Sequence, residues 1–182
     1  MRTKAGLERF STVAIVLHWG IALLVIANLV LAENAEGLRG PARGALMGPH
    51  TAIGITVLLL SVLLIAWRIT HRRPAYPQEM RRWERSLSNA LRVVFYILII
   101  AIPLTGWLLV SAHQGAEGID WFGLFTVPPL PVTADKSGHE LIEAVHKNFG
   151  GAMIYLIGLH VLGALKHMFI DKMPYFHRMW PS

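Results

Sequence analysis

The feature that most constrains this sequence is a series of four apolar runs, each long enough to cross a lipid bilayer. A helix needs roughly 20 predominantly apolar residues to span about 30 Å of hydrocarbon. Charged residues make up only 15% of the 182 residues, against about a quarter in a typical soluble domain. The sequence therefore predicts an all-α integral membrane protein, an antiparallel four-helix bundle in a single domain over 1–182. The expected transmembrane helices cover about 12–32, 48–69, 88–111 and 142–170.

The first run also has features of a secretory signal peptide, because basic residues precede it and Val30-Leu31-Ala32 has the small-residue pattern of a cleavage site. It is longer than the apolar core of such a peptide, and it contains His18 and Asn28. We therefore expect it to remain as the first transmembrane helix. Pro49 is expected in the first turn of the second helix, where proline is tolerated. Pro103 is expected to kink the third.

The basic residues set the expected orientation. Thirteen of the 17 basic residues flank one set of helix ends: Arg2, Lys4, Arg9, Arg68, Arg72, Arg73, Arg81, Arg82, Arg85, Arg92, Lys166, Lys172 and Arg178. By the positive-inside rule this side is cytoplasmic and holds both termini. The opposite side keeps four basic residues against seven acidic ones: Arg39, Arg43, Lys136 and Lys147 against Glu33, Glu36, Glu117, Asp120, Asp135, Glu140 and Glu143. Because the basic residues alternate with apolar runs and line no exposed groove, no nucleic-acid partner is expected.

Histidines are the residues most suggestive of chemistry in this chain. There are nine of them, and an ionisable side chain inside a membrane segment is costly enough to mark a functional candidate. Any one of them could instead be a core histidine bonded to a neighbouring carbonyl. His71, His113, His139 and His177 fall in connections or the tail and are interpreted as surface residues. The four that fall within or at the mouths of predicted helices are His18, His50, His146 and His160.

The spacing of these four histidines predicts two pairs. His146 and His160 are 14 residues apart, so they share a helix face and are separated by about 21 Å along the axis. The predicted topology places His50 at the depth of His146, near the outer surface. It places His18 at the depth of His160, near the inner surface. His167 lies about 10 Å beyond His160 on nearly the same face, so depth alone leaves His160 and His167 both open as the partner of His18.

Two opposed imidazoles indicate haem rather than zinc. Structural zinc takes four protein ligands, commonly with thiolate or carboxylate among them, and the chain has no cysteine. Haem iron needs only two axial ligands, and the absence of cysteine excludes covalent attachment. Small residues one turn after the ligands, among them Gly54, Gly150 and Gly163, leave room for a porphyrin or simply for close helix packing. Arg68, Arg92 and Lys166 are candidates to neutralise haem propionates.

With these residues in view, the sequence resembles the bacterial cytochrome b561 family, four-helix dihaem proteins of the inner membrane. The matching stretches are Leu17-His18-Trp19, Pro49-His50 with Gly54 and Arg68, Ile102-Pro103-Leu104-Thr105-Gly106, Val145-His146, Gly158-Leu159-His160 and Lys166-His167-Met168-Phe169 with Asp171 and Met173. The resemblance implies two noncovalent haem b groups with His18, His50, His146 and His160 as axial ligands, and it leaves His167 as a neighbour. It also implies electron exchange with ubiquinone and, in one branch, oxidation of superoxide at the periplasmic face.

The sequence departs from the family pattern at two places. Asn89 and Arg92 stand near the start of the third helix, where a histidine is common, and Leu64 stands where an arginine often precedes the one matched by Arg68. These departures concern contacts to quinone or propionates at the inner face rather than the axial ligands. The outer connections carry a net negative charge, which repels an anion such as superoxide unless the basic residues cluster.

Three functions fit the sequence. The first is transmembrane electron transfer through two bis-histidine haems, with ubiquinone and possible periplasmic donors as partners. The second is a cytochrome b subunit that links a dehydrogenase or hydrogenase to quinone. The third is a haem-free transporter or membrane anchor whose histidines bind metal, which predicts a colourless protein.

Overall fold

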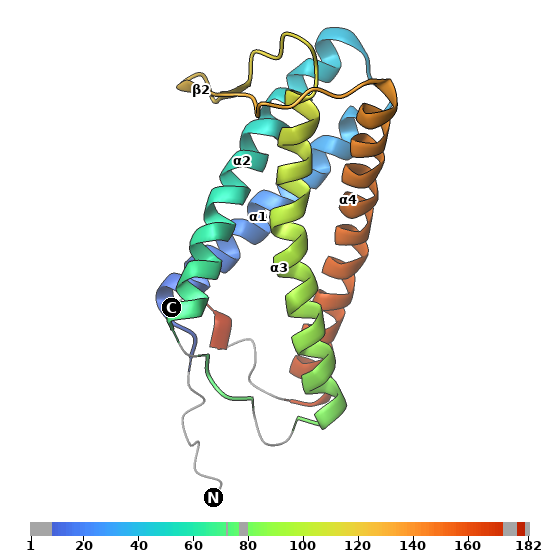
Figure 1. Ribbon diagram of the computed structural model, residues 1–182. Helices are drawn as coiled ribbons and strands as arrows, with labels where there is room; N and C mark the ends of the chain where they lie inside the picture. The colour runs from blue at the N-terminus through green and yellow to red at the C-terminus, as the bar shows by residue number, and fades with distance from the viewer. Residues whose placement is uncertain (1–8, 72, 77–79, 173–177, 181–182) are drawn as a thin grey trace, which may run out of the picture.

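The computed structural model of the chain describes residues 9–71, 73–76, 80–172 and 178–180 and is an all-α transmembrane four-helix bundle (Figure 1). All four long helices are apolar enough to cross a membrane. The elements are α1 (Thr12–Ala35), α2 (Gly40–Thr70), α3 (Arg82–Ser111), β1 (Ile119–Trp121), β2 (Phe125–Val127), α4 (Lys136–Leu165) and a π-helical turn, η1 (Lys166–Ile170). The predicted fold class is thus confirmed, with a two-stranded hairpin added in the last connection.

Polar caps, rather than the loss of hydrophobicity, mark where α1 and α4 begin, and α4 starts ahead of its apolar run. Ser11 caps α1 by accepting a hydrogen bond from Ala14 N. Asp135 caps α4 in the same way, with Gly138 N as the donor. The placement of Pro49 in a first helical turn is wrong. Helix α2 already begins at Gly40, with Pro41 in its first turn, so Pro49 lies inside the helix.

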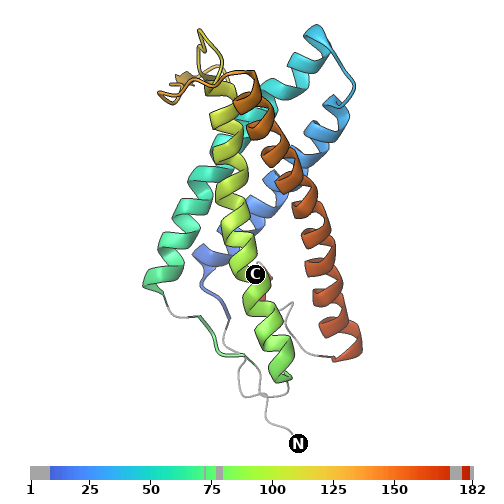
Figure 2. The same ribbon diagram turned by 45° about the vertical axis from the view of Figure 1, so that its right-hand side comes forward.

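Each helix runs antiparallel to the one before it, and each packs against the next in the chain (Figures 1 and 2). Helix α1 runs obliquely behind the others in both views. We call the end of the bundle that carries β1 and β2 the hairpin end. We call the opposite end, where Phe10 N donates to Arg178 O at 3.2 Å, the termini end.

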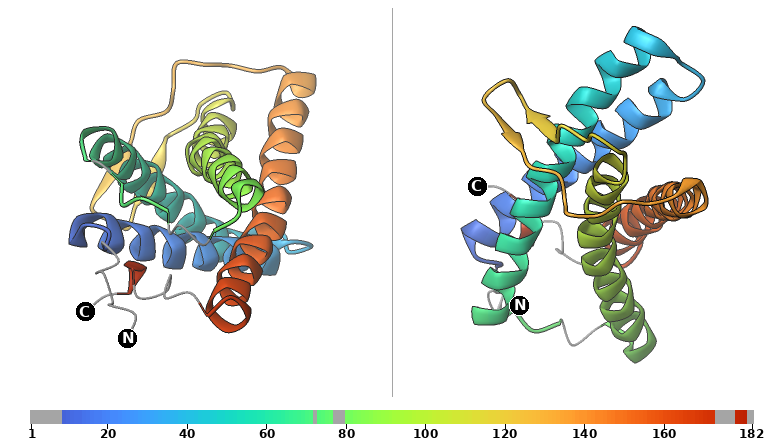
Figure 3. Two further views of the ribbon diagram at one scale, coloured as in Figure 1. Left: turned by 90° about the horizontal axis from the view of Figure 1, so that it is seen from below. Right: turned by 45° about the horizontal axis from the view of Figure 1, so that its top comes forward.

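The hairpin lies beside α2 (Figure 3). Strands β1 and β2 are antiparallel, with Asp120 opposite Thr126. Trp121 Nε1 donates to Thr56 Oγ1 on α2 at 3.1 Å, which fixes the hairpin to the bundle. Ile119 is buried, so this connection reaches into the interior between the helix ends.

Two apolar clusters hold the helices together. One is centred on Ile21, Val57 and Leu64 and joins α1 to α2, and the other joins α3 to α4 through Leu98, Ile99 and Met153. Large apolar side chains cover much of the outside, including Leu23, Leu59, Ile97 and Leu162, all at least half exposed. A soluble protein rarely exposes so much contiguous apolar surface. Here lipid covers it, and the helices satisfy their own backbone hydrogen bonds.

Candidate functional site

At the hairpin end the structure brings together His50 from α2 and His146 from α4. Their ring centroids lie 6.1 Å apart and their planes cross at 86°. His50 Nδ1 lies 3.1 Å from Asn28 O, and His146 Nδ1 lies 3.0 Å from Ile102 O. Each Nδ1–H can therefore donate to a backbone carbonyl, which fixes the tautomer and leaves Nε2 as the basic nitrogen. A second hydrogen bond of this kind is typical of histidines that ligate metals.

These two histidines line a pocket enclosed by α1, α2, α3, α4 and the hairpin. It holds about 570 Å³ of space, including the part open to the outside, and is bordered by Gly54, Gly106 and Ile119. Asn28 Oδ1 is buried in this region and has no hydrogen-bond partner among the described residues. Gly54 is predicted to leave room for a porphyrin. Its position agrees with that role, because a Cβ there would meet only Asn28 Nδ2, at 3.9 Å.

Sequence reasoning missed three residues that orient this pair. Thr105 Oγ1 lies 3.1 Å from His146 Nδ1, and Asn28 supplies the carbonyl facing His50. At Gly106, a Cβ would lie 3.0 Å from His146 Cε1, so a larger residue would push the imidazole away from α3. In the sequence, Thr105 and Gly106 appear only within a family motif, because a helical glycine carries no sign of which ring lies above it.

Replacing Gly106 with alanine is expected to displace His146 and to weaken or abolish binding at the hairpin-end pair. The ring cannot easily move away, because Ile102 O and Thr105 Oγ1 both hold its Nδ1. The measurement is the haem content and low-spin spectrum of the purified variant. Gly44→Ala on α2 is the matched control, because this helical glycine is exposed and a Cβ there meets nothing within 4 Å. Equal spectra for the two variants would show that Gly106 has no such role.

At the termini end the structure brings together His18 from α1 and His160 from α4. Their ring centroids are 6.3 Å apart, with the planes at 66°. Aromatic rings flank both histidines. The ring centroid of Trp19 lies 5.6 Å from that of His18, and the ring centroid of Phe95 lies 5.5 Å from that of His160. Trp19 Nε1 donates to Met179 O at 2.7 Å, so the end of the chain packs beside this pair.

Arginines gather near the termini-end pair. Arg68 lies over the Phe10 ring at 4.5 Å, and its buried Nε has no hydrogen-bond partner among the described residues. Arg92 donates to Tyr76 OH at 2.7 Å and to Asn89 Oδ1 at 2.9 Å. The Nε–H of Arg68 is therefore available to donate a hydrogen bond to a haem propionate. The predicted propionate contact of Lys166 is not supported, because its ammonium group is bonded elsewhere, as described next.

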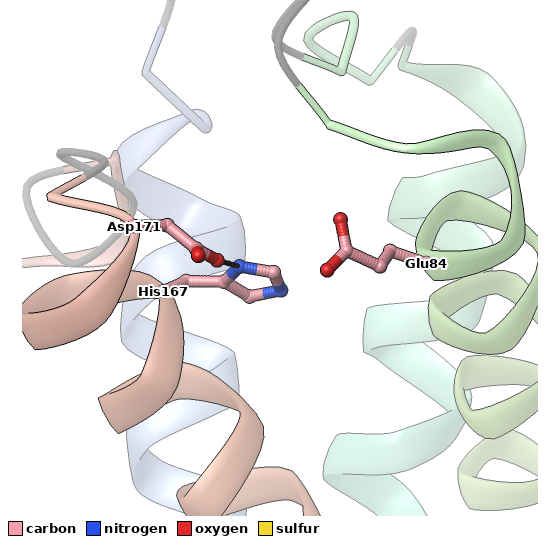
Figure 4. Close-up of side chains that lie close together, drawn as sticks. All are labelled: Glu84, His167 and Asp171. Atoms are coloured by element: carbon pink, nitrogen blue, oxygen red, sulfur yellow. Dashed lines mark hydrogen bonds and ion pairs between the residues drawn. The ribbon is translucent and has the colours of Figure 1, made fainter.

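Lys166 belongs to an ionic cluster with Glu84, His167 and Asp171 (Figure 4). Its Nζ lies 2.5 Å from Glu84 Oε1 and 2.8 Å from Asp171 Oδ2. His167 Nδ1 contacts the same Asp171 oxygen at 2.7 Å. The side chains of Glu84, His167 and Asp171 are close enough to hold a metal ion, but the Lys166 ammonium already binds an oxygen of each carboxylate. The cluster ties the first turn of α3 to the end of α4.

Asp171→Asn is expected to lower thermal stability at neutral pH, and the deficit should shrink as the solution is acidified. The hydrogen bond from Lys166, assisted by His167, holds the pKa of Asp171 below its ordinary value. A depressed carboxyl pKa contributes stability above the ordinary value, about 3.9, and loses it as pH falls through the folded-state pKa. Thermal unfolding of both proteins across this range is the measurement. A deficit that is constant with pH would contradict the ionic account.

Both central pairs have the spacing that a bis-histidine haem requires. Two metal–nitrogen bonds of about 2.0 Å, with about 1.1 Å more from each nitrogen to its ring centre, put the centroids about 6.2 Å apart. The observed separations are 6.1 and 6.3 Å. Among the described residues, neither pair belongs to a group of three or more metal-binding side chains, which disfavours tetrahedral zinc. The donor set therefore fits haem, whose porphyrin supplies the other four ligands.

The remaining histidines lie outside these pairs. His71 stacks on Trp67, with centroids 3.6 Å apart, and is exposed, in keeping with its interpretation as a surface residue. His113 is exposed, His139 is half-buried, and their rings contact each other, a contact that no sequence pattern predicts. His177 lies outside the described residues.

Comparison with known proteins gives a consistent result. The family model described as prokaryotic cytochrome b561 matches residues 9–182. Cytochrome b561 homolog 1 from Escherichia coli (strain K12) is 30% identical over 181 residues, covering 96% of this chain and 98% of the relative. Cytochrome b561 homolog 2 from the same organism is 27% identical, covering 94% of this chain and 91% of the relative. A protein named probable superoxide oxidase CybB, from Yersinia pestis, is 26% identical and covers 96% and 97%.

Proposed function

The chain belongs to the prokaryotic cytochrome b561 family, and from this premise we propose that it carries electrons across the bacterial inner membrane between two haem b groups. His50 and His146 would hold one haem, and His18 and His160 the other. The proposed redox partner is the ubiquinone pool. When bound, each haem supplies a one-electron carrier with both axial positions filled, which suits outer-sphere transfer.

The observation that carries this proposal is the presence of two imidazole pairs at two depths of one bundle. His146 and His160 both lie on α4, about 21 Å apart along its axis, and each faces a histidine of another helix. A single pair would serve one side of the membrane. Two pairs in line support an electron path from one surface to the other.

We further propose that the hairpin end faces the periplasm and the termini end the cytoplasm. The described residues of the termini end include Arg68, Arg73 and Arg92 beside the connection to α3. Basic residues favour the cytoplasmic side. At the hairpin end Lys136 and Lys147 are paired with Glu140 and Glu143, so little net positive charge remains there.

Superoxide is a second candidate electron donor, at the hairpin end. The name of the relative from Yersinia pestis favours it. The charge of the hairpin end argues against superoxide, because the lysines there are paired with glutamates and attract an anion only weakly. The two candidates make different predictions about which reagent reduces the protein.

The test uses the purified haem-loaded protein in liposomes. If the chain exchanges electrons with quinone, ubiquinol should reduce it, as seen by the appearance of the reduced α-band. His71→Gln, which changes an exposed histidine outside the pairs, is the control and should behave like the wild type. Quinone exchange would be refuted if ubiquinol fails to reduce the protein and ubiquinone also fails to reoxidise the dithionite-reduced protein. Superoxide generated outside the vesicles should reduce the protein, and superoxide dismutase should prevent it, only if the second candidate is right.

A further inference from the structure

We propose that His113 and His139 form a binding site for a first-row divalent cation, Zn²⁺ or Cu²⁺, at the hairpin end. His113 follows the last turn of α3, and His139 lies in the first turn of α4. Their Nε2 atoms are 3.1 Å apart, and their ring centroids are 4.5 Å apart at an interplanar angle of 44°. His113 is exposed and His139 is half-buried, so a cation can reach the pair from water. This site does not depend on the proposed electron-transfer function.

The geometry of this pair differs from that of the two central pairs. Axial ligands on opposite sides of a haem iron need their nitrogens about 4 Å apart, so a separation of 3.1 Å excludes that arrangement. Two bonds of about 2.05 Å to one cation, with nitrogens 3.1 Å apart, enclose an angle of about 98°. This value lies between the octahedral and tetrahedral angles. The pair is therefore a bent chelate rather than an axial pair.

The backbone holds the two histidines in place without help from a metal. Ala134 N donates to Ala112 O at 3.3 Å, which joins the start and the end of the last connection. Ser111 Oγ accepts from Leu130 N at 2.9 Å, and the Asp135 cap fixes the first turn of α4. Because these contacts already set the distance between the rings, little ordering is needed on binding, and pre-organisation of this kind raises affinity.

The chemistry of the donors limits which cation fits. Imidazole suits zinc and copper rather than magnesium or calcium, which prefer oxygen ligands. Glu143 lies one turn along α4 from His139, and its carboxylate is 2.8 Å from Lys147 Nζ. We therefore assign two protein ligands, with water filling the remaining positions. A simple hydrogen bond between the two rings would produce the same nitrogen contact, so the experiment must detect the metal itself.

The test is Zn²⁺ binding to the haem-loaded protein, prepared without a polyhistidine tag and measured by calorimetry together with bound zinc per chain. The wild type should bind one more zinc than His113→Gln or His139→Gln, or bind it at least tenfold more tightly. His71→Gln is the matched control, since it removes an exposed histidine at the termini end, and should retain wild-type binding. An unchanged haem spectrum in every variant establishes that all are folded.

Wild-type zinc binding in both His113→Gln and His139→Gln would overturn the site. So would zinc binding that is lost in Asp171→Asn instead, since the ion would then lie in the Glu84–His167–Asp171 cluster. Cu²⁺ gives an independent readout. The wild-type copper electron paramagnetic resonance signal should show coupling to two imidazole nitrogens, and each single variant should lose that pattern. Identical copper signals in the wild type and both variants would also refute the assignment.

Discussion

Replacing His50 or His146 with alanine is expected to remove the same haem from the protein, leaving about half of the haem absorbance. Their rings face each other with centroids 6.1 Å apart, so each substitution removes one axial ligand of a single iron. The double variant should lose no more than either single one, because the two side chains act on one site. Haem content and redox titration of the three proteins are the measurements.

The corresponding pair at the other end supplies the contrast. His18→Ala and His160→Ala should each remove the second spectral component and spare the one lost in His50→Ala. The pairing would be wrong if His50→Ala and His160→Ala removed the same component while His146→Ala spared it.

Replacing His160 with alanine is expected to release the termini-end haem or make it high-spin, whereas His167→Ala should retain both haems. His160 faces His18 within the bundle, while His167 is bonded to Asp171 at the end of α4. A haem moved out to His167 would expose porphyrin that burial favours by about 25 cal/mol per Å². A shifted reduction potential is the largest effect expected for His167→Ala, since outer contacts tune a bound metal.

Low-temperature electron paramagnetic resonance of the two variants separates these outcomes. An intact low-spin bis-histidine signal at the termini end of His160→Ala would contradict the assignment. Loss of a haem in His167→Ala, with His160→Ala unaffected, would transfer the ligand role to His167.

The sequence was most informative where hydrophobicity and spacing act over long stretches. Four apolar runs could only be satisfied by membrane-spanning helices, and this prediction is confirmed. The step of 14 residues between His146 and His160 could be interpreted as two sites on one face, because helical geometry is regular. The structure brings each of these histidines close to another in α1 or α2; their role as haem ligands remains a prediction.

Features that depend on contacts between distant segments could not be predicted. The extra turns at the start of α2 are polar enough to lie outside any apolar run, so the sequence pattern places Pro49 at the start of the helix. The helix begins at Gly40, nine residues before Pro49. The hairpin is short and is fixed by Trp121 on Thr56. Gly106 matters because of the ring of His146, which is 40 residues away in sequence. The contact between His113 and His139 likewise depends on how the last connection closes.

The ratio of haem to polypeptide tests the central claim most directly. Haem b can be quantified as its pyridine complex and polypeptide by amino-acid analysis, in protein purified after expression with added haem precursor. Acid–acetone extraction should remove all the colour, because the chain has no cysteine to bind haem covalently. Two imidazole pairs predict two haems per chain. A fully loaded preparation with one haem per chain, or a colourless folded protein, would contradict the account.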